Sequence, residues 1–248
     1  MIFDFHCHFS RSFFRYRACR MELEGLVAEM ERHGVGRAVI SAAGEYAAYS
    51  VREGNDEVGA AVRRYPERFV GFATVNPWMR AGALTELRRA RQDLSLRGLV
   101  LHPMLHGHDA NDALVFPVVE EAIALGMPVY ITGGAPLLAV PYKIADVAGR
   151  YPEARFIMGH AGWDFHFDVL YCLEACPNLW VETSKNEIAN LDSIVRTRGA
   201  ARVLFGSDHP FSSYESEIAK IRLLPGVAPH DIDRILGLNA LELLEGRA

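Results

Sequence analysis

Short apolar runs rich in β-branched residues alternate with longer amphipathic stretches along the whole chain. Eight runs have the length and composition of β-strands: Ile2–His6, Ala38–Ser41, Phe69–Val75, Gly98–His102, Pro128–Ile131, Arg155–Met158, Leu179–Glu182 and Arg202–Phe205. The stretches between and after them are typical of amphipathic helices: Glu22–His33, Glu57–Tyr65, Ala83–Leu94, Phe116–Leu125, Tyr142–Tyr151, Phe165–Glu174, a less regular Ile188–Arg198, Glu215–Leu223 and His230–Leu244. Gly34 and Gly126 follow two of these stretches, where a left-handed residue commonly ends a helix.

Strands that alternate with helices of this length predict βαβ units and a parallel sheet. Eight units close most naturally into a (β/α)8 TIM barrel of about 250 residues, so we expect an α/β fold with residues 1–248 as one domain. A doubly wound open sheet is the alternative. That fold usually has a glycine-rich phosphate-binding turn after its first strand, and this chain has His-Cys-His there.

Composition and charge narrow the class of protein further. The 26 basic and 31 acidic side chains give a net charge of −5, which does not favour a nucleic-acid partner. No apolar run approaches the roughly 18 residues of a membrane span, and the first residues, MIFDFHCHF, lack the pattern of a secretory signal. We therefore expect a cytoplasmic protein with no membrane partner and with reduced cysteines.

Candidate chemistry begins at the end of the first strand, with His6-Cys7-His8. Alternate strand residues share a face, so His6 and His8 point the same way and Cys7 points the opposite way. Two imidazoles on a rigid strand make a half-site for a metal such as zinc. The alternative is a pair of polar residues at a strand end with no such role.

Two further candidates follow the sixth and eighth strands. His160 lies in Gly159-His-Ala-Gly162, and Asp208 lies in Gly206-Ser-Asp208. A carboxylate there could complete a metal shell or accept a proton, although an Asx turn or a buried turn histidine would give the same sequence. Because the C-terminal strand ends of a barrel meet on one face, we expect these side chains to lie close to His6 and His8.

Other residues are candidates for substrate contacts. His102 ends the fourth strand and can face substrate or metal, whereas His106 and His108 follow on a presumed loop and are expected to be exposed unless they join the site. Residues 11–20 hold four arginines, and Arg15 and Arg17 could form a loop that selects an anionic substrate. Trp163 could line the pocket that binds this substrate, or it could pack in the core. A solvated basic loop or a subunit contact is the alternative for the arginines.

The three motifs together resemble the amidohydrolase superfamily, and more closely its branch that contains aminocarboxymuconate-semialdehyde decarboxylase. Further matches extend the resemblance over essentially the full length: Asn55-Asp56, Arg64–Ala73, Gly98–Pro103, Gly126–Val129 and Ile235–Ala240. The resemblance implies a divalent metal, most often Zn2+, held by His6, His8 and Asp208. It also implies that His160 lies beside the metal-bound water and acts as acid and base, with Asp208 as a proton acceptor.

The chain departs from the family pattern after the fifth strand, where Thr132 stands at the position of a histidine ligand. A threonine hydroxyl is a poor zinc ligand compared with imidazole. Three outcomes remain open: His160 replaces the missing ligand, water fills the gap, or the site works without metal, as in some lactonases of this branch.

We expect a metal-dependent hydrolase that acts on a small, carboxylated, anionic substrate through metal-activated water. The alternatives are a nonoxidative decarboxylase of the same branch, a metal-free lactonase, and a non-catalytic homologue. The sequence leaves the oligomeric state open, with a homodimer as one possibility.

Overall fold

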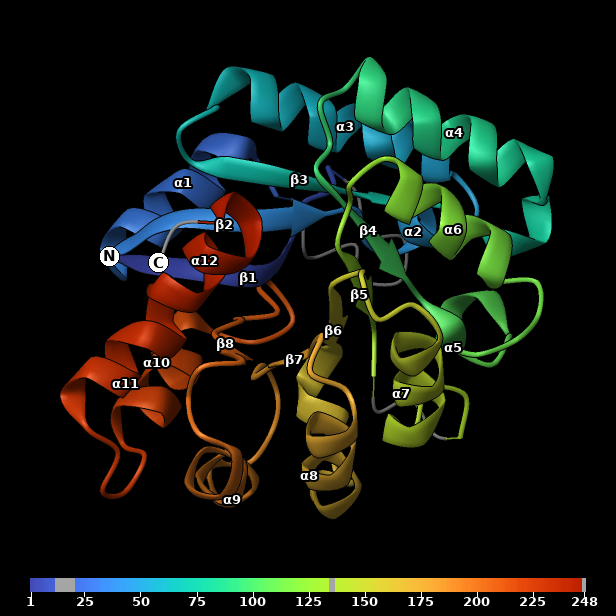
Figure 1. Ribbon diagram of the computed structural model, residues 1–248. Coiled ribbons are helices and arrows are strands. Elements are labelled where there is room, and N and C mark those ends of the chain that lie inside the picture. The colour runs from blue at the N-terminus through green and yellow to red at the C-terminus, as the bar shows by residue number, and fades with distance from the viewer. Residues whose placement is uncertain (12–20, 134–136, 247–248) are drawn as a thin grey trace.

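A computed structural model describes residues 1–11, 21–133 and 137–246 of the chain (Figure 1). Eight strands form one sheet in chain order, and all neighbouring strands in that order are parallel. The strands are β1 (Ile2–His8), β2 (Val35–Ser41), β3 (Phe69–Thr74), β4 (Gly98–Leu101), β5 (Val129–Ile131), β6 (Phe156–Met158), β7 (Leu179–Glu182) and β8 (Val203–Leu204).

Hydrogen bonds between the first and last strands close the sheet. The amide of Phe5 donates to the carbonyl of Phe205 at 2.7 Å, and the amide of Asp208 donates to the carbonyl of His6 at 2.7 Å. The expected (β/α)8 TIM barrel is therefore confirmed, and the open sheet is excluded.

Helices surround the barrel and follow the strands as the alternating pattern predicts (Figure 1). They are α1 (Leu23–Arg32), α2 (Glu45–Ala48), α3 (Val51–Arg64), η2 (Pro77–Met79), α4 (Ala81–Gln92), α5 (Pro103–His106), α6 (Phe116–Ala124), α7 (Pro141–Arg150), η3 (Gly159–Gly162), α8 (His166–Ala175), α9 (Ile188–Arg198), α10 (Tyr214–Arg222), α11 (Pro229–Asp233), the π-helical turn η4 (Arg234–Leu238) and α12 (Asn239–Glu245). Gly34 and Gly126 both have positive φ, as expected of residues that end α1 and α6.

Helix α12 closes the N-terminal end of the barrel. Ala240 and Leu243 belong to the same buried cluster as the interior side chains of β1, β3 and β4. Arg97 and Arg155, which precede β4 and β6, donate to the last carbonyl groups of this helix. The opposite end, where the strands finish, is the end that the candidate site residues occupy.

The main differences from the expected elements lie at their boundaries. Helix α3 begins at Val51, six residues before the expected start at Glu57. Its first turns bury Gly54 and Asn55, and the Asn55 amide bonds to the backbone of Thr74 at 2.9 and 3.0 Å. Because these buried residues are not apolar, the hydrophobic pattern did not reveal the first turns.

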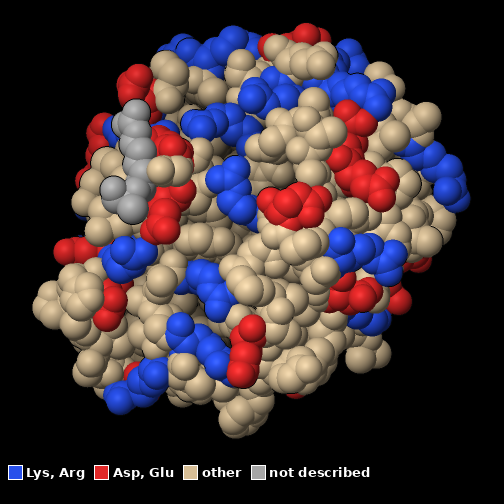
Figure 2. Space-filling view, viewed as in Figure 1, with Lys and Arg blue, Asp and Glu red and all other residues tan. Residues whose placement is uncertain are grey.

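The face of the molecule in Figure 2 carries basic and acidic side chains in alternation rather than one basic surface. Neighbouring helices are joined by such pairs: Arg88 of α4 bonds Glu121 of α6, and Arg89 of α4 bonds Asp56 of α3. Among the described residues, no helix combines the length and apolar character needed to span a bilayer.

Candidate functional site

Strand β1 places both His6 and His8 at the mouth of the barrel. Its pairing register with β2 shifts between Asp4 and Cys7. Phe5 is part of the interior cluster, and the next residue, His6, also points inward because its ring stacks on Tyr130 at 4.6 Å. Cys7 instead packs in the outer layer between barrel and helices. The prediction that the two histidines share a face opposite Cys7 is therefore confirmed, and the shift explains how Phe5 and His6 can both face inward.

Asp208 lies between these imidazoles. Its Oδ1 atom is 3.2 Å from Nε2 of His6 and 3.1 Å from Nε2 of His8, and its Oδ2 atom is 2.5 Å from Nζ of Lys185. The preceding Ser207 anchors the turn, because its amide and hydroxyl both donate to the buried carboxylate of Asp4. A carboxylate from the turn after β8, two imidazoles from β1 and an ammonium group after β7 thus meet at one point.

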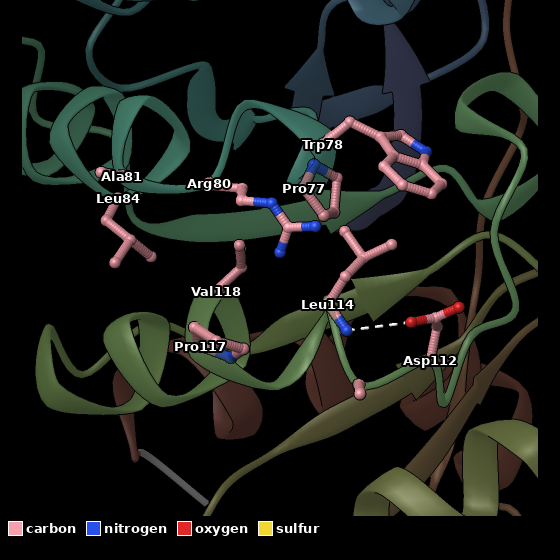
Figure 3. A pocket seen from close by; sticks show the side chains of 10 residues that line it. Pro77, Trp78, Arg80, Ala81, Leu84, Asp112, Leu114, Pro117 and Val118 are labelled. Atoms are coloured by element: carbon pink, nitrogen blue, oxygen red, sulfur yellow. Dashed lines mark hydrogen bonds between the residues drawn. The ribbon is translucent and has the colours of Figure 1, made fainter.

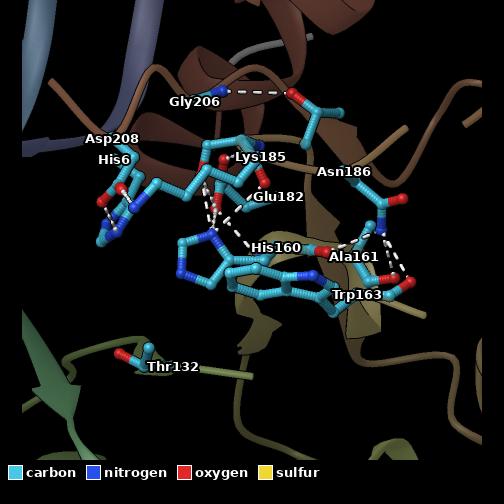
Figure 4. A network of polar contacts seen from close by, with 12 residues as sticks. His6, Thr132, His160, Ala161, Trp163, Glu182, Lys185, Asn186, Gly206 and Asp208 are labelled. Atoms are coloured by element: carbon cyan, nitrogen blue, oxygen red, sulfur yellow. Dashed lines mark hydrogen bonds and ion pairs between the residues drawn. The ribbon is translucent and has the colours of Figure 1, made fainter. Parts of the chain in front are cut away.

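His160 reaches the same place from a strained turn after β6. His160 and Ala161 both have positive φ, which is uncommon for residues with a side chain. Asn186 holds this turn from the next connection, since its amide donates to the carbonyl groups of His160, Ala161 and Trp163 at 2.8, 3.2 and 3.2 Å. Figure 4 shows His160 with one ring edge towards Glu182, near His6 and Asp208.

The donor set fits a divalent metal. One ligand atom each from His6, His160 and Asp208 lies within 4.8 Å of the others, and all three residues are buried. His8 is not in that group, but it shares the Asp208 oxygen with His6. Donors bound to one ion at about 2 Å lie roughly 3 Å apart, as the His–Asp208 distances do. Imidazole with carboxylate suits zinc and similar borderline ions.

Thr132, at the usual position of a histidine ligand, contacts another histidine. Its hydroxyl lies 3.0 Å from Nδ1 of His102, and in Figure 4 Thr132 stands apart from the contacts around Asp208. His102 is 6% exposed, and its Nε2 is buried with no hydrogen-bond partner. Thr132 therefore orients His102, and the unpartnered nitrogen is available for a ligand.

The expected exposure of His106 and His108 is wrong, because both are buried. Nε2 of His106 lies 2.9 Å from the Ala47 carbonyl, and Nδ1 of His108 lies 2.8 Å from the Asp109 carbonyl. Residues 103–106 form the short helix α5, which folds this segment inward where a loop was expected.

The remaining candidates have different outcomes. Trp163 is 37% exposed, and its ring packs edge-on against His160 at 5.4 Å between centroids, so it lies beside the site and is not part of the core. Arg15 and Arg17 lie outside the described residues. A separate pocket, with a volume of about 430 Å3, lies between η2, α4 and α6. Figure 3 shows the side chains that line it. Its lining includes Arg80 and Asp112 but none of the candidate site residues.

Burial and neighbouring charge set the protonation of the site. Burial alone would raise the pKa of Asp208, but hydrogen bonds from His6 and His8 hold it well below its usual range. Burial lowers the pKa of His160 to about 4 and keeps that of His102 well below its ordinary value. At neutral pH the site therefore holds a charged carboxylate and at least two neutral imidazoles.

The sequence offers no basis for assigning a role to three residues of this site: Glu182, Ser184 and Lys185. All three lie at or just after the end of β7, the same position in the barrel as the residues that were found. The segment Glu182-Thr-Ser-Lys185 contains no histidine and matches no metal-ligand spacing, so only its place after a strand could have indicated a role.

Comparisons with known proteins agree with this architecture. The chain is 24% identical over 239 residues to the 2-amino-3-carboxymuconate-6-semialdehyde decarboxylase of Dictyostelium discoideum, a match that covers 77% of this chain and 65% of that protein. The chain thus spans just under two thirds of the relative's length.

Solved structures match the fold closely. A TIM-barrel protein of unknown function from Bordetella bronchiseptica has a TM-score of 0.83 at 20% identity, with 99% of each chain covered. A dihydroxybenzoic acid decarboxylase from Polaromonas, solved with manganese and the inhibitor 2-nitroresorcinol, has a TM-score of 0.79 at 18% identity, with 100% of this chain and 98% of that chain covered. The amidohydrolase family model matches residues 3–246. The chain therefore belongs to the amidohydrolase family.

Proposed function

We propose that this protein is a metal-dependent nonoxidative decarboxylase that acts on a small carboxylated aromatic substrate. The observation that carries the proposal is the convergence of His6, His8, His160 and Asp208 in one buried site at the barrel mouth. The similar proteins with a named activity described above are decarboxylases, so they favour this reaction over the hydrolysis expected from the motifs.

His6, His8 and Asp208 would hold a divalent ion, and His160 would lie beside it. Zn2+ was expected from the resemblance, and Mn2+ is the ion named for one structural relative. When bound, such an ion supplies a Lewis acid that polarises oxygen atoms of the substrate. Lys185, which pairs with Asp208, adds a positive charge next to the carboxylate.

The reaction breaks the bond between a ring carbon and its carboxylate, releases carbon dioxide, and leaves an electron pair on that carbon. A proton must then be added there. His160 is neutral at neutral pH, so we assign it the task of taking a proton from solvent at Nε2 and delivering it to the carbon. Asp208 stays charged throughout and stabilises the imidazolium form.

His102 and Trp163 would orient the substrate. The Thr132 hydroxyl can donate to Nδ1 of His102, which leaves an N–H group at the buried, unpartnered Nε2. This group would bind an anionic oxygen of the substrate. The exposed face of Trp163 beside His160 would pack against an aromatic ring.

Product analysis tests the proposal. The purified protein is incubated with divalent metal and a panel of hydroxybenzoic acids and unsaturated dicarboxylic acids, and carbon dioxide and the decarboxylated product are quantified. We expect carbon dioxide release in a one-to-one ratio with product, lost in His160→Gln. A parallel panel of lactones and amides tests hydrolysis. Turnover on that panel alone would contradict the decarboxylase assignment.

A further inference from the structure

Glu182, at the end of β7, is a fully buried carboxylate whose two oxygen atoms both act as acceptors. Backbone amides can only donate, and the amide of His160 donates to Oε2 at 3.1 Å while that of Ser184 donates to Oε1 at 2.5 Å. The Tyr130 hydroxyl adds a third bond to Oε2 at 2.8 Å. The carboxylate therefore has a fixed orientation and offers acceptors towards its neighbours.

Ser184 links this carboxylate to the His160 ring. Its hydroxyl lies 3.0 Å from Oε2 of Glu182 and 2.9 Å from Nδ1 of His160. A hydroxyl has one hydrogen, and the carboxylate oxygen already serves as an acceptor, so the Ser184 hydrogen points to Glu182. The same hydroxyl oxygen must then accept a hydrogen from Nδ1.

A second acceptor reinforces this direction. The backbone carbonyl of Ser184 lies 3.3 Å from Nδ1 of His160, and a carbonyl cannot donate. Both neighbours of Nδ1 therefore favour a hydrogen on that nitrogen, and the closer hydroxyl contributes more than the carbonyl. A neutral imidazole with hydrogen on Nδ1 has its lone pair on Nε2, the nitrogen on the other edge of the ring (Figure 4).

We propose that Glu182 is a positioning residue that acts through Ser184 to hold His160 in the Nδ1–H tautomer, with the Nε2 lone pair directed at the barrel mouth. The lone pair then serves as proton acceptor or metal donor without a prior rearrangement. Such outer partners of a site histidine are known to fix ring orientation and tautomer. The tautomer is inferred from the contacts alone, and this proposal rests on the proposed function only where it gives His160 a role in catalysis.

Nitrogen NMR tests the tautomer without any substrate. Protein labelled with 15N-histidine is recorded at neutral pH, free of metal and again with diamagnetic zinc, and His160 is assigned from the signals missing in His160→Gln. We expect hydrogen on Nδ1 of His160 in both states. Hydrogen on Nε2 in the metal-free protein would overturn the proposal.

Two variants test the route. Glu182→Leu removes the acceptor of the Ser184 hydroxyl, which can then donate to Nδ1, so we expect hydrogen on Nε2. Ser184→Ala leaves only the longer carbonyl contact, so we expect the Nε2–H tautomer beside the Nδ1–H tautomer. An unchanged tautomer in either variant would overturn the route through Ser184, and Ser184→Ala decides the matter if Glu182→Leu does not fold.

A matched control separates this effect from general loss of a buried acid. Glu86 of α4 is also a buried carboxylate, bonded to Asn55 and Arg89, and Glu86→Leu should leave the His160 signals unchanged. Turnover in Glu182→Leu should fall about 10- to 100-fold at unchanged KM, as for other residues that orient a site histidine. A protein with the expected tautomers but no decarboxylation would contradict only the proposed function.

Discussion

At the scale of single residues, Asp208 is the group on which the site depends most. One oxygen contacts both histidines of β1 and the other contacts Lys185, so a single carboxylate links three charged or polar groups in a buried place. Because these contacts keep the pKa of Asp208 well below its usual range, the side chain is negatively charged at neutral pH.

Asp208→Asn should abolish turnover while the fold survives. The amide has the same shape but no negative charge, so it binds a metal poorly and cannot stabilise a charged His160; we expect activity to fall at least about 1,000-fold. The measurement is carbon dioxide release together with the circular dichroism spectrum. Asp192→Asn, on the outer helix α9, is the control. Near-normal rates for the Asp208 variant would refute its role.

Thr132 offers a test of the missing strand-5 ligand. Thr132→His should restore an imidazole beside the site and raise zinc affinity by about 10-fold or more, measured by competition with a chelating dye. Thr132→Val keeps the shape but removes the hydroxyl that orients His102, so KM should rise while zinc affinity is unchanged. If the histidine variant gains no affinity, this position does not face the metal.

The described cysteines should be unreactive in the folded protein. Cys7, Cys172 and Cys176 are buried free thiols, and burial raises the pKa of Cys172 to about 12. At pH 8 only about one Cys172 side chain in 10,000 would be a thiolate, the reactive form. Alkylation followed by peptide mass spectrometry should find Cys172 unmodified until denaturant is added. Rapid modification in buffer would contradict its burial.

At the scale of helices and strands, the tight packing of strand ends shapes the site. A methyl group on Gly206 would lie 1.9 Å from a carboxylate oxygen of Glu182, so β8 can approach β7 only because residue 206 has no side chain. His160 and Asp208 both have positive φ, and each lies in a turn that leads from a strand to a helix. These turns aim side chains at the mouth, where an ordinary turn would point them elsewhere.

Gly206→Ala should therefore destabilise the protein by about 1–3 kcal/mol, the usual cost of overpacking a tight core. Gly82→Ala in α4 is the matched control, because its new methyl group would lie 3.7 Å from its nearest neighbour, in ordinary contact. The control should be neutral or stabilising by up to about 1 kcal/mol. The free energy of unfolding in urea measures both changes, and equal stabilities would contradict the close approach of Gly206 and Glu182.

The sequence predicted the bounds of helices and strands well where apolar residues recur at regular spacing, and less well elsewhere. The strand Leu179–Glu182 has the predicted bounds, and so does the helix Ile188–Arg198, although its apolar pattern is less regular. The first turns of α3 were missed because Gly54 and Asn55 are buried without being apolar. The register shift in β1 was not predictable either, since it depends on pairing with a neighbouring strand.

At the scale of the whole molecule, barrel closure explains why the site could be predicted in outline. Parallel strands in chain order bring residues 6, 8, 160 and 208 to one face, so a count of strands sufficed to group them. The contacts that orient these groups could not be predicted from the sequence. Glu182, Ser184 and Asp4 act through hydrogen bonds between segments distant in the chain, and such pairs leave no periodic signal.

Anomalous X-ray scattering from a crystal grown with Mn2+ shows whether His6, His8 and Asp208 bind a metal ion. We expect one strong anomalous peak within about 2–2.3 Å of the nearest nitrogen atoms of His6 and His8 and of an oxygen of Asp208. The peak should vanish in a His6→Ala, His8→Ala double variant that still folds. A wild-type crystal with no peak at the barrel mouth, or with a peak that these side chains do not contact, would contradict a metal site at His6, His8 and Asp208.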